Sequence, residues 1–352
     1  MNAPFRRTAA FAPIAACCAA LAFVPAARAG GDDPPCAEVT SPTAPLPPTR
    51  ADGTRISYCW GERSWREPDD NGQPRLHQSF YFYPAAAPSP LGAHSAHPLV
   101  MYFHPDGSRS LIDRDANASL YDQVVQQASD AGWSVVSVEF RHPVVDAGVP
   151  NEPPLDRRVP HWDVAYATQF LRRIAVALDA DTDNVFSVGF SRGSLSLWTA
   201  LQPDMASPRE PQSTRVNAVF GYQAQTTYRG DQFAALFVVP ADQAEVIAGF
   251  DEQYPQHAQF GSALDAVASG SPPVMLRYED PFGPYPVPAV YFLGAPGQPP
   301  VYSRVHFPGY GQELCDRYRA RAPRTPCSVQ ASVPFERAFD GYVDFLTRYL
   351  KR

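Results

Sequence analysis

The chain has 352 residues, of which 45% are hydrophobic and 12% aromatic, so it is long enough for one large domain or two small ones with a substantial core. Its formal net charge is -7 and it lacks runs of basic residues. This balance argues against nucleic acid or an anionic membrane surface as a partner.

Residues 1–29 have the pattern of a secretory signal peptide. Two arginines precede an apolar stretch, residues 8–27, and Ala27-Arg28-Ala29 is a small-residue cleavage pattern. The mature protein is therefore expected to be secreted or periplasmic, without a membrane attachment after cleavage. Cys17 ends a lipobox-like sequence and leaves a lipoprotein as the alternative. The residues after Cys17 are strongly apolar, however, whereas a lipidated terminus normally opens on polar residues.

Residues 30–50 are rich in Pro, Thr and Ser, which predicts a tether or a loop on the surface. An even number of cysteines follows the cleavage site, which in an oxidising compartment predicts disulfides. We favour the local pairings, Cys36–Cys59 and Cys315–Cys327, over the other combinations. Free buried thiols are one alternative. A metal site built from these cysteines is the weakest, because no Cys-x-x-Cys spacing occurs among them.

Residues 51–352 alternate between strand and helix patterns. Strands are predicted at residues 54–60, 77–84, 98–105, 134–141, 184–190, 217–223, 272–279 and 327–333. Helices are predicted at residues 119–131, 160–178, 194–201, 309–321 and 334–350. Continuous apolar strands separated by helices indicate a mostly parallel central sheet with helices on both faces. Its front edge is predicted to be an antiparallel hairpin, with a turn at Asp69–Gly72.

Two insertions interrupt this alternation. Residues 226–272 are predicted to form a small cap, and residues 281–305 are rich in Pro and aromatic side chains. Both follow late strands, at the end of a parallel sheet where loops carry function.

The strand at residues 184–190 runs into Gly189-Phe190-Ser191-Arg192-Gly193, and a helix pattern continues from there. A Gly-x-Ser-x-Gly sequence between a strand and a helix exposes the serine hydroxyl above a sheet and points the helix N-terminus at developing negative charge. Ser191 is therefore the candidate nucleophile. The alternative is an ordinary strand-to-helix turn with a capping serine.

The strand at residues 98–105 leads into His104-Pro105-Asp106-Gly107. Here the chain resembles the α/β-hydrolase fold, and within it the bacterial esterases related to hormone-sensitive lipase, the acetyl esterase group. Those esterases carry His-Gly-Gly-Gly after the equivalent strand. Residues 135–143 look like their strand ending in Tyr-Arg-Leu-Ala-Pro. The resemblance covers about residues 78–350 and implies an α/β-hydrolase domain over residues 51–352.

The resemblance implies an oxyanion hole made by the backbone N–H groups of Asp106, Gly107 and Arg192. Pro105 stands where the family has a glycine, but that position is not an expected donor. Asp106 also replaces a glycine and adds negative charge near the developing oxyanion. We interpret His104 as a structural residue that braces its loop. The Arg192 side chain is interpreted as pairing with a surface acid rather than with an anionic substrate.

The acid of a Ser-acid-His triad is expected after the seventh strand of this fold, where Asp280 follows Glu279. Asp231, after the sixth strand, is the backup. The family's histidine follows the last strand, but residues 327–339 contain none. The triad order leaves His306 as the only base that can accompany Asp280. His257 is a weaker candidate that would need an acid upstream of it.

We therefore predict an exported serine hydrolase that cleaves a carboxylic ester through an acyl-enzyme on Ser191, with Asp280 as acid and His306 as base. The substrate would be a small-molecule or polysaccharide-linked ester. No cofactor and no metal are expected, since His94 and His97 lie in a loop without an acid or cysteine beside them. The alternative is a degenerate hydrolase that binds a ligand without turnover, because the histidine after the last strand is absent.

Overall fold

The computed structural model describes residues 54–57, 66–68, 74–76, 79–105, 118–138, 140, 161–208, 211–227, 229, 232, 236, 262–283 and 306–352. All of these belong to one unit of the chain, Cys36–Arg352. The expected signal peptide, the tether, Cys36 and Cys59 lie outside the described residues, as does most of each predicted insertion.

Eight described strands form one sheet, in the spatial order β1-β4-β6-β5-β7-β8-β9-β10. Their bounds are β1 Thr54–Ser57, β4 Ser79–Tyr83, β5 His97–Phe103, β6 Ser134–Val138, β7 Ala180–Phe190, β8 Val219–Tyr222, β9 Val274–Arg277 and β10 Cys327–Gln330. β4 runs antiparallel to both β1 and β6. From β6 to β10 every neighbouring pair is parallel. The mostly parallel sheet with an antiparallel N-terminal edge is thus confirmed.

The edge differs in one respect from the prediction. Two further short strands, β2 (Arg66–Pro68) and β3 (Pro74–Leu76), pair with each other antiparallel in a sheet of their own. The turn predicted at Asp69–Gly72 falls between β2 and β3 in the sequence, outside the described residues, while β1 and β4 pair with each other antiparallel.

The helical segments lie between the strands. They are α1 Ala118–Leu120, η1 Tyr121–Gln126, α2 Gln127–Asp130, α3 His161–Ile174, η4 Ala175–Leu178, η5 Ser191–Ser194, α4 Leu195–Leu201, α8 Ala263–Ala266, α9 Pro308–Arg321, η6 Phe335–Arg337 and α10 Tyr342–Thr347. η1 is a π-helical turn, and η4, η5 and η6 are 3-10 turns.

The closing helix is shorter than predicted. Instead of one helix over residues 334–350, the structure has the short turn η6 and then α10. Gly341 separates them with a φ of 64°, in the left-handed region that glycine adopts without steric cost. The helical spacing of apolar residues in the sequence continues through this position, but the helix itself is interrupted at Gly341.

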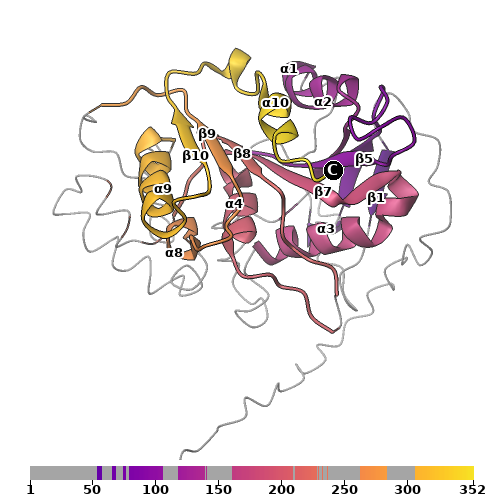
Figure 1. Ribbon diagram of the computed structural model, residues 1–352, viewed down its shortest axis with the longest axis horizontal. Coiled ribbons are helices and arrows are strands. Elements are labelled where there is room, and N and C mark those ends of the chain that lie inside the picture. Colours follow the sequence, from indigo (N-terminus) through magenta and orange to yellow (C-terminus); the bar gives the residue numbers. More distant parts are fainter. Residues whose placement is uncertain are drawn as a thin grey trace, which may run out of the picture. The chain divides into compact units, whose positions relative to one another are not determined.

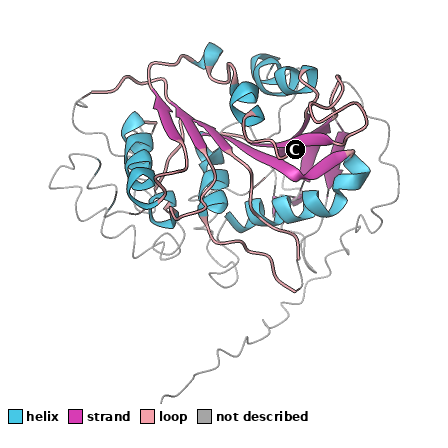
Figure 2. Cartoon of the chain, viewed as in Figure 1, coloured by secondary structure: helices cyan, strands magenta, loops and turns pink. Residues whose placement is uncertain are grey.

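Helices cover both faces of the sheet, and each face has its own apolar core (Figures 1 and 2). Successive residues of β5 alternate between the two cores. Leu99, Met101 and Phe103 belong to the core that also includes residues of α3, α4 and α9, whereas Val100 and Tyr102 belong to the core that includes residues of η1 and α10. This explains why β5 is apolar throughout, since a central parallel strand is buried on both sides.

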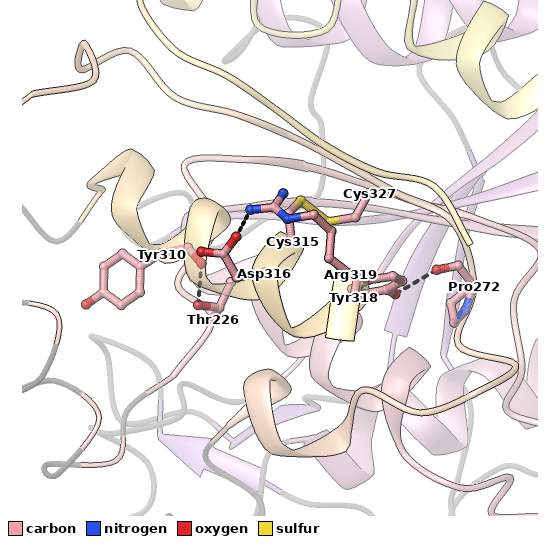
Figure 3. The surroundings of a disulfide bond; sticks show 8 residues. All are labelled: Thr226, Pro272, Tyr310, Cys315, Asp316, Tyr318, Arg319 and Cys327. Atoms are coloured by element: carbon pink, nitrogen blue, oxygen red, sulfur yellow. Dashed lines mark hydrogen bonds and ion pairs between the residues drawn. A yellow bond between two sulfur atoms is a disulfide. The ribbon is translucent and has the colours of Figure 1, made fainter. Parts of the chain in front are cut away.

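The two cysteines Cys315 and Cys327 form a disulfide, with their Cα atoms 5.2 Å apart. It ties α9 to the first residue of β10 (Figure 3). Further contacts attach the same helix: Tyr318 donates from its hydroxyl to the Pro272 carbonyl oxygen at 2.7 Å. The local pairing predicted for these cysteines is confirmed, whereas the Cys36–Cys59 pairing lies outside the described residues.

Among the helices that the structure describes, none combines the length and the apolar character that crossing a membrane requires.

Replacing both Cys315 and Cys327 by Ser should lower the free energy of unfolding. The disulfide closes a segment with a sequence separation of 12. Loop-closure entropy predicts a loss of about 3 kcal/mol for a loop of that order. Urea unfolding of the wild type and of the double variant measures the difference. An unchanged midpoint and slope would show that α9 is held by its non-covalent contacts alone.

Candidate active site

Ser191 stands at a sharp bend between β7 and η5. Its φ is 50°, in the left-handed region that a residue with a side chain seldom adopts. The residue is 7% exposed. A serine held in this strained conformation at the end of a parallel strand has the geometry of a nucleophile elbow.

The two glycines of the motif are required by close backbone packing. A Cβ atom on Gly193 would collide with the carbonyl group of Phe103, the last residue of β5. A Cβ atom on Gly189 would collide with the Gly193 carbonyl and with the Ser196 hydroxyl. The bend can therefore form only with glycine at both positions, as the tight turn predicted from the sequence implies.

Side-chain hydrogen bonds hold the bend in place. Ser194 donates from its hydroxyl to the Ser191 carbonyl oxygen, and the same hydroxyl accepts the Gln225 N–H at 2.8 Å. Trp198 on α4 donates to the Gln225 carbonyl oxygen, also at 2.8 Å. The segment after β8 is thereby locked to the bend. Sequence reasoning missed these residues, and serine or glutamine at such positions carries no recognisable signal.

His306 is brought to Ser191 from 115 residues away in the sequence. The His306 Nε2 atom lies 2.8 Å from the Ser191 Oγ atom, within hydrogen-bonding distance. His306 occupies a turn just before α9, which begins with Pro308 in its first turn. The start of α9 is anchored by Thr226, whose hydroxyl donates to the Tyr310 carbonyl oxygen at 3.0 Å (Figure 3). The structure thus places an imidazole where it can accept the serine proton.

Asp280 lies in the turn after β9, partly exposed. Its carbonyl oxygen accepts the N–H of Ser332 at 3.2 Å. The neighbouring Glu279 is exposed and accepts a hydrogen bond from the Gln223 side chain at 3.1 Å. The structure brings Ser191 and His306 together, whereas the role of Asp280 as the acid stays a prediction.

The other predicted site residues fall into two groups. Asp106, Gly107, Asp231 and His257 lie outside the described residues. Arg192 is described and lies in the first turn of η5, where backbone N–H groups have no acceptor within the helix. Its guanidinium lies over the Phe140 ring, with Cζ 4.6 Å from the ring centroid. The predicted pairing of this side chain with a surface acid stays a prediction.

The place where the family's histidine is expected holds aromatic side chains instead. Phe335, in η6 after β10, packs against Phe190 with ring centroids 5.8 Å apart and against Tyr222 at 6.3 Å. Phe190 and Tyr222 are themselves 5.1 Å apart. Phe190 directly precedes Ser191, so this aromatic cluster packs next to the bend.

Two tyrosines near the site act as neutral donors. Burial raises the pKa of Tyr278 well above its ordinary value, and its hydroxyl donates to the Ala224 carbonyl oxygen at 2.7 Å. Burial, with a contribution from the charge of Glu279, also raises the pKa of Tyr222, which donates to the Val333 carbonyl oxygen at 3.1 Å. Neither phenol is suited to take a proton from Ser191 at neutral pH.

The described residues include no group of three or more His, Cys, Asp or Glu side chains placed to hold a metal ion. His97, considered as a metal ligand in the sequence, places Nδ1 2.8 Å from the Gly132 carbonyl oxygen and Nε2 3.8 Å from a carboxylate oxygen of Asp179. These contacts lie at the opposite end of β5 from His104.

No family model matches the chain, and no curated protein is similar to it in sequence. Solved structures of esterase 2 from the Planctomycetes species Thermogutta terrifontis are similar in fold. The propionate-bound form has a TM-score of 0.51 at 14% identity, covering 85% of this chain and 94% of that one. The form phosphonylated by sarin has a TM-score of 0.52 at 14% identity, covering 87% and 98%. The apo form has a TM-score of 0.50 at 13% identity, covering 88% of this chain and 100% of that one. The chain has an α/β-hydrolase-like fold, as predicted.

Replacing Gly193 by Ala should displace the bend from β5, because the added methyl group meets the Phe103 backbone. We expect lower thermal stability and a loss of reaction between Ser191 and a fluorophosphonate probe. Gly270→Ala is the control, since its φ of 93° also disfavours alanine but nothing lies within 4 Å of the added atom. That variant should lose about 1 kcal/mol of stability and keep its reactivity. Equal reactivity of both variants would contradict the role assigned to Gly193.

Proposed function

We propose that this protein is a serine hydrolase that cleaves carboxylic esters through an acyl-enzyme on Ser191. The observation that carries the proposal is the 2.8 Å contact between Ser191 Oγ and His306 Nε2. A serine in a strained bend, with an imidazole at hydrogen-bonding distance, is the arrangement that activates a hydroxyl as a nucleophile. The fold similarity to a protein described as an esterase supports the same reaction class.

The geometry suggests the following sequence of steps. His306 Nε2 takes the hydroxyl proton while Ser191 Oγ attacks the ester carbonyl carbon. The negative oxygen that develops is stabilised by the Arg192 N–H and, following the family resemblance, by the N–H groups of Asp106 and Gly107. His306 then gives its proton to the departing alkoxide, which leaves as the alcohol. Water, activated by the same imidazole, hydrolyses the acyl-enzyme and regenerates Ser191.

Asp280 is the acid that we propose for orienting His306. Its support is its position after β9, which is the place that the family resemblance gives to the acid. A carboxylate on the second ring nitrogen would hold Nε2 toward Ser191 and stabilise the imidazolium that forms. Replacement of Asp280 by Asn tests this assignment directly.

A carboxylic ester, small or attached to a polysaccharide, is the proposed substrate. The structural neighbour was captured with propionate bound and in a form phosphonylated by sarin. Propionate is a short carboxylate, the kind of product that an ester hydrolase releases. The order of the motifs further leads us to place the chain beside the bacterial esterases related to hormone-sensitive lipase.

Export to the periplasm or to the outside of the cell completes the proposal. It rests on the signal-peptide pattern of residues 1–29 and on the Cys315–Cys327 disulfide, a bond that is typical of oxidising compartments.

The alternative function is that of a binding protein without turnover, which the missing histidine after β10 would suggest. The position of His306 favours the enzyme, because an imidazole from another element reaches the same hydroxyl.

Ser191→Ala should abolish both fluorophosphonate labelling and ester hydrolysis. His306→Ala should slow them by roughly four to six orders of magnitude, the range typical of losing a triad member. His97→Ala is the matched control and should retain full activity. Labelling that survives His306→Ala would move the base elsewhere, and a wild type that is never labelled would favour the binding protein.

Asp280→Asn should lower kcat by roughly three to four orders of magnitude if this carboxylate orients the imidazole. Glu279→Gln is the neighbouring control, since Glu279 is exposed and contacts Gln223 instead. It should change kcat by less than about twofold. Steady-state hydrolysis of a p-nitrophenyl ester measures both. If Asp280→Asn retains activity, the acid lies elsewhere and Asp231→Asn becomes the variant to test.

A further inference from the structure

Residues Ala224–Thr226, which we call the bridging segment, follow β8 and contact both the bend at Ser191 and the start of α9. Each of the three is at most 4% exposed. Gln223, immediately before them, has a φ of 51°, so the chain leaves β8 through a left-handed residue. The Gln223 N–H donates to the Arg277 carbonyl oxygen at 2.7 Å. The course of the bridging segment is therefore set at the carboxyl ends of β8 and β9.

Ser194 joins the bridging segment to the bend. It is buried at the end of η5. Its hydroxyl oxygen accepts the Gln225 N–H at 2.8 Å, and its hydroxyl hydrogen is donated to the Ser191 carbonyl oxygen. Because a single side-chain oxygen makes both bonds, the backbone of the bridging segment is held in a fixed place relative to the backbone of the nucleophile.

Thr226 joins the bridging segment to α9. It is fully buried, and its hydroxyl donates to the Tyr310 carbonyl oxygen at 3.0 Å (Figure 3). Tyr310 in turn donates its N–H to the Phe307 carbonyl oxygen at 3.1 Å. Phe307 directly follows His306 in the sequence. Two hydrogen bonds therefore connect the Thr226 hydroxyl to the residue next to the proposed base.

Tyr278, after β9, contacts both the bridging segment and α9. Its hydroxyl donates to the Ala224 carbonyl oxygen at 2.7 Å. A Cβ atom on Gly311 of α9 would lie 2.8 Å from Cε2 of the Tyr278 ring, so the missing side chain lets the helix approach this closely. The start of α9 thus packs on the same tyrosine that holds the bridging segment.

This arrangement bears on the 2.8 Å separation of Ser191 Oγ and His306 Nε2. The nucleophile and the imidazole come from segments that are distant in the sequence, and the bridging segment is bonded to the bend on one side and to α9 on the other. A displacement of about 1 Å between reacting groups can cost about 100-fold in rate. A hydroxyl that fixes the start of α9 against the bend therefore affects proton transfer without touching the substrate.

We propose that Thr226 is a positioning residue for the proton transfer from Ser191 to His306, acting through the first turn of α9. This inference rests on the proposed function. Ser194 acts at the other end of the same bridge, where it fixes the bridging segment to the nucleophile. Because Thr226 is fully buried, its effect on the reaction is indirect.

The test separates kcat from KM. Thr226→Val removes the hydroxyl and keeps the branched shape of the side chain. With a p-nitrophenyl ester, kcat should fall about 10- to 100-fold, because the imidazole is no longer held where it can take the proton. KM should change by less than about threefold, since the substrate contacts are unchanged. Thr226→Ser retains a hydroxyl and should keep kcat within about threefold of the wild type.

A second comparison asks whether Thr226 acts through His306. In the His306→Ala variant, adding Thr226→Val should slow fluorophosphonate labelling by less than about twofold further, because the group that Thr226 positions is already removed. In the presence of His306, the same substitution should slow labelling about as much as it lowers kcat.

Thr168→Val is the matched control. Thr168 is also buried, and its hydroxyl donates to the Val164 carbonyl oxygen at 2.8 Å within α3. This variant should leave kcat unchanged. Thermal unfolding of every variant checks folding. If Thr226→Val does not fold, Ser194→Ala breaks the other end of the bridge and carries the test, with the same expected loss of kcat.

The outcomes separate this inference from the proposed function. A wild type without turnover or labelling would overturn both. An active wild type with unchanged kcat in Thr226→Val, or in Ser194→Ala where that variant carries the test, would overturn the positioning role alone. An equal loss of labelling with and without His306 would overturn it too, because Thr226 would then act on the fold as a whole.

Discussion

The close approach of Gly193 to the carbonyl group of Phe103 constrains the position of Ser191, because it leaves no room for a side chain between η5 and the end of β5. The chain leaves β7 beside the end of β5, with Gly189 in register with Phe103, and can turn into η5 only through a left-handed residue. Ser191 is that left-handed residue, and its backbone carries the conformational strain of the bend. The parallel sheet, apolar on both faces, supplies the rigidity that maintains it. The candidate nucleophile therefore depends on backbone packing between two strands more than on any contact of its own side chain.

The proposed base comes from an unusual element for a fold of this kind. After β10, where the family resemblance leads one to look for a histidine, Phe335 packs on Phe190 and Tyr222. This aromatic cluster continues the core on the α10 side of the sheet and leaves no imidazole there. His306 approaches Ser191 from the start of α9 instead. A histidine from a different segment can thus reach the same hydroxyl, provided that this segment is held as firmly as the end of a strand.

Much of this architecture was readable in the sequence, for reasons that the structure makes clear. The central strands were predicted correctly because burial on both faces forces an unbroken apolar run, as in β5. The bend at Ser191 was visible because only glycine fits at Gly189 and Gly193. Other features were hidden because they depend on contacts distant in sequence. The bond from Gln225 to Ser194 and the contact of Arg192 with His104 join elements whose sequences carry no local sign of each other. The break at Gly341 was missed because the apolar spacing of the last segment continues across it.

The firmness of α9 follows from how the helix is attached. Thr226 binds its first turn, Tyr318 binds the Pro272 carbonyl near its last, and the disulfide joins its middle to β10 (Figure 3). An imidazole on a flexible loop would lose conformational entropy whenever it adopted the position next to Ser191. That cost would reduce the fraction of molecules in which the two side chains are placed to react. An imidazole immediately before a helix fixed at three places has little such freedom. The packing of α9 on the sheet therefore helps to set the separation of Ser191 and His306, so that under the proposed function the attachments of α9 serve the site as well as the stability of the fold.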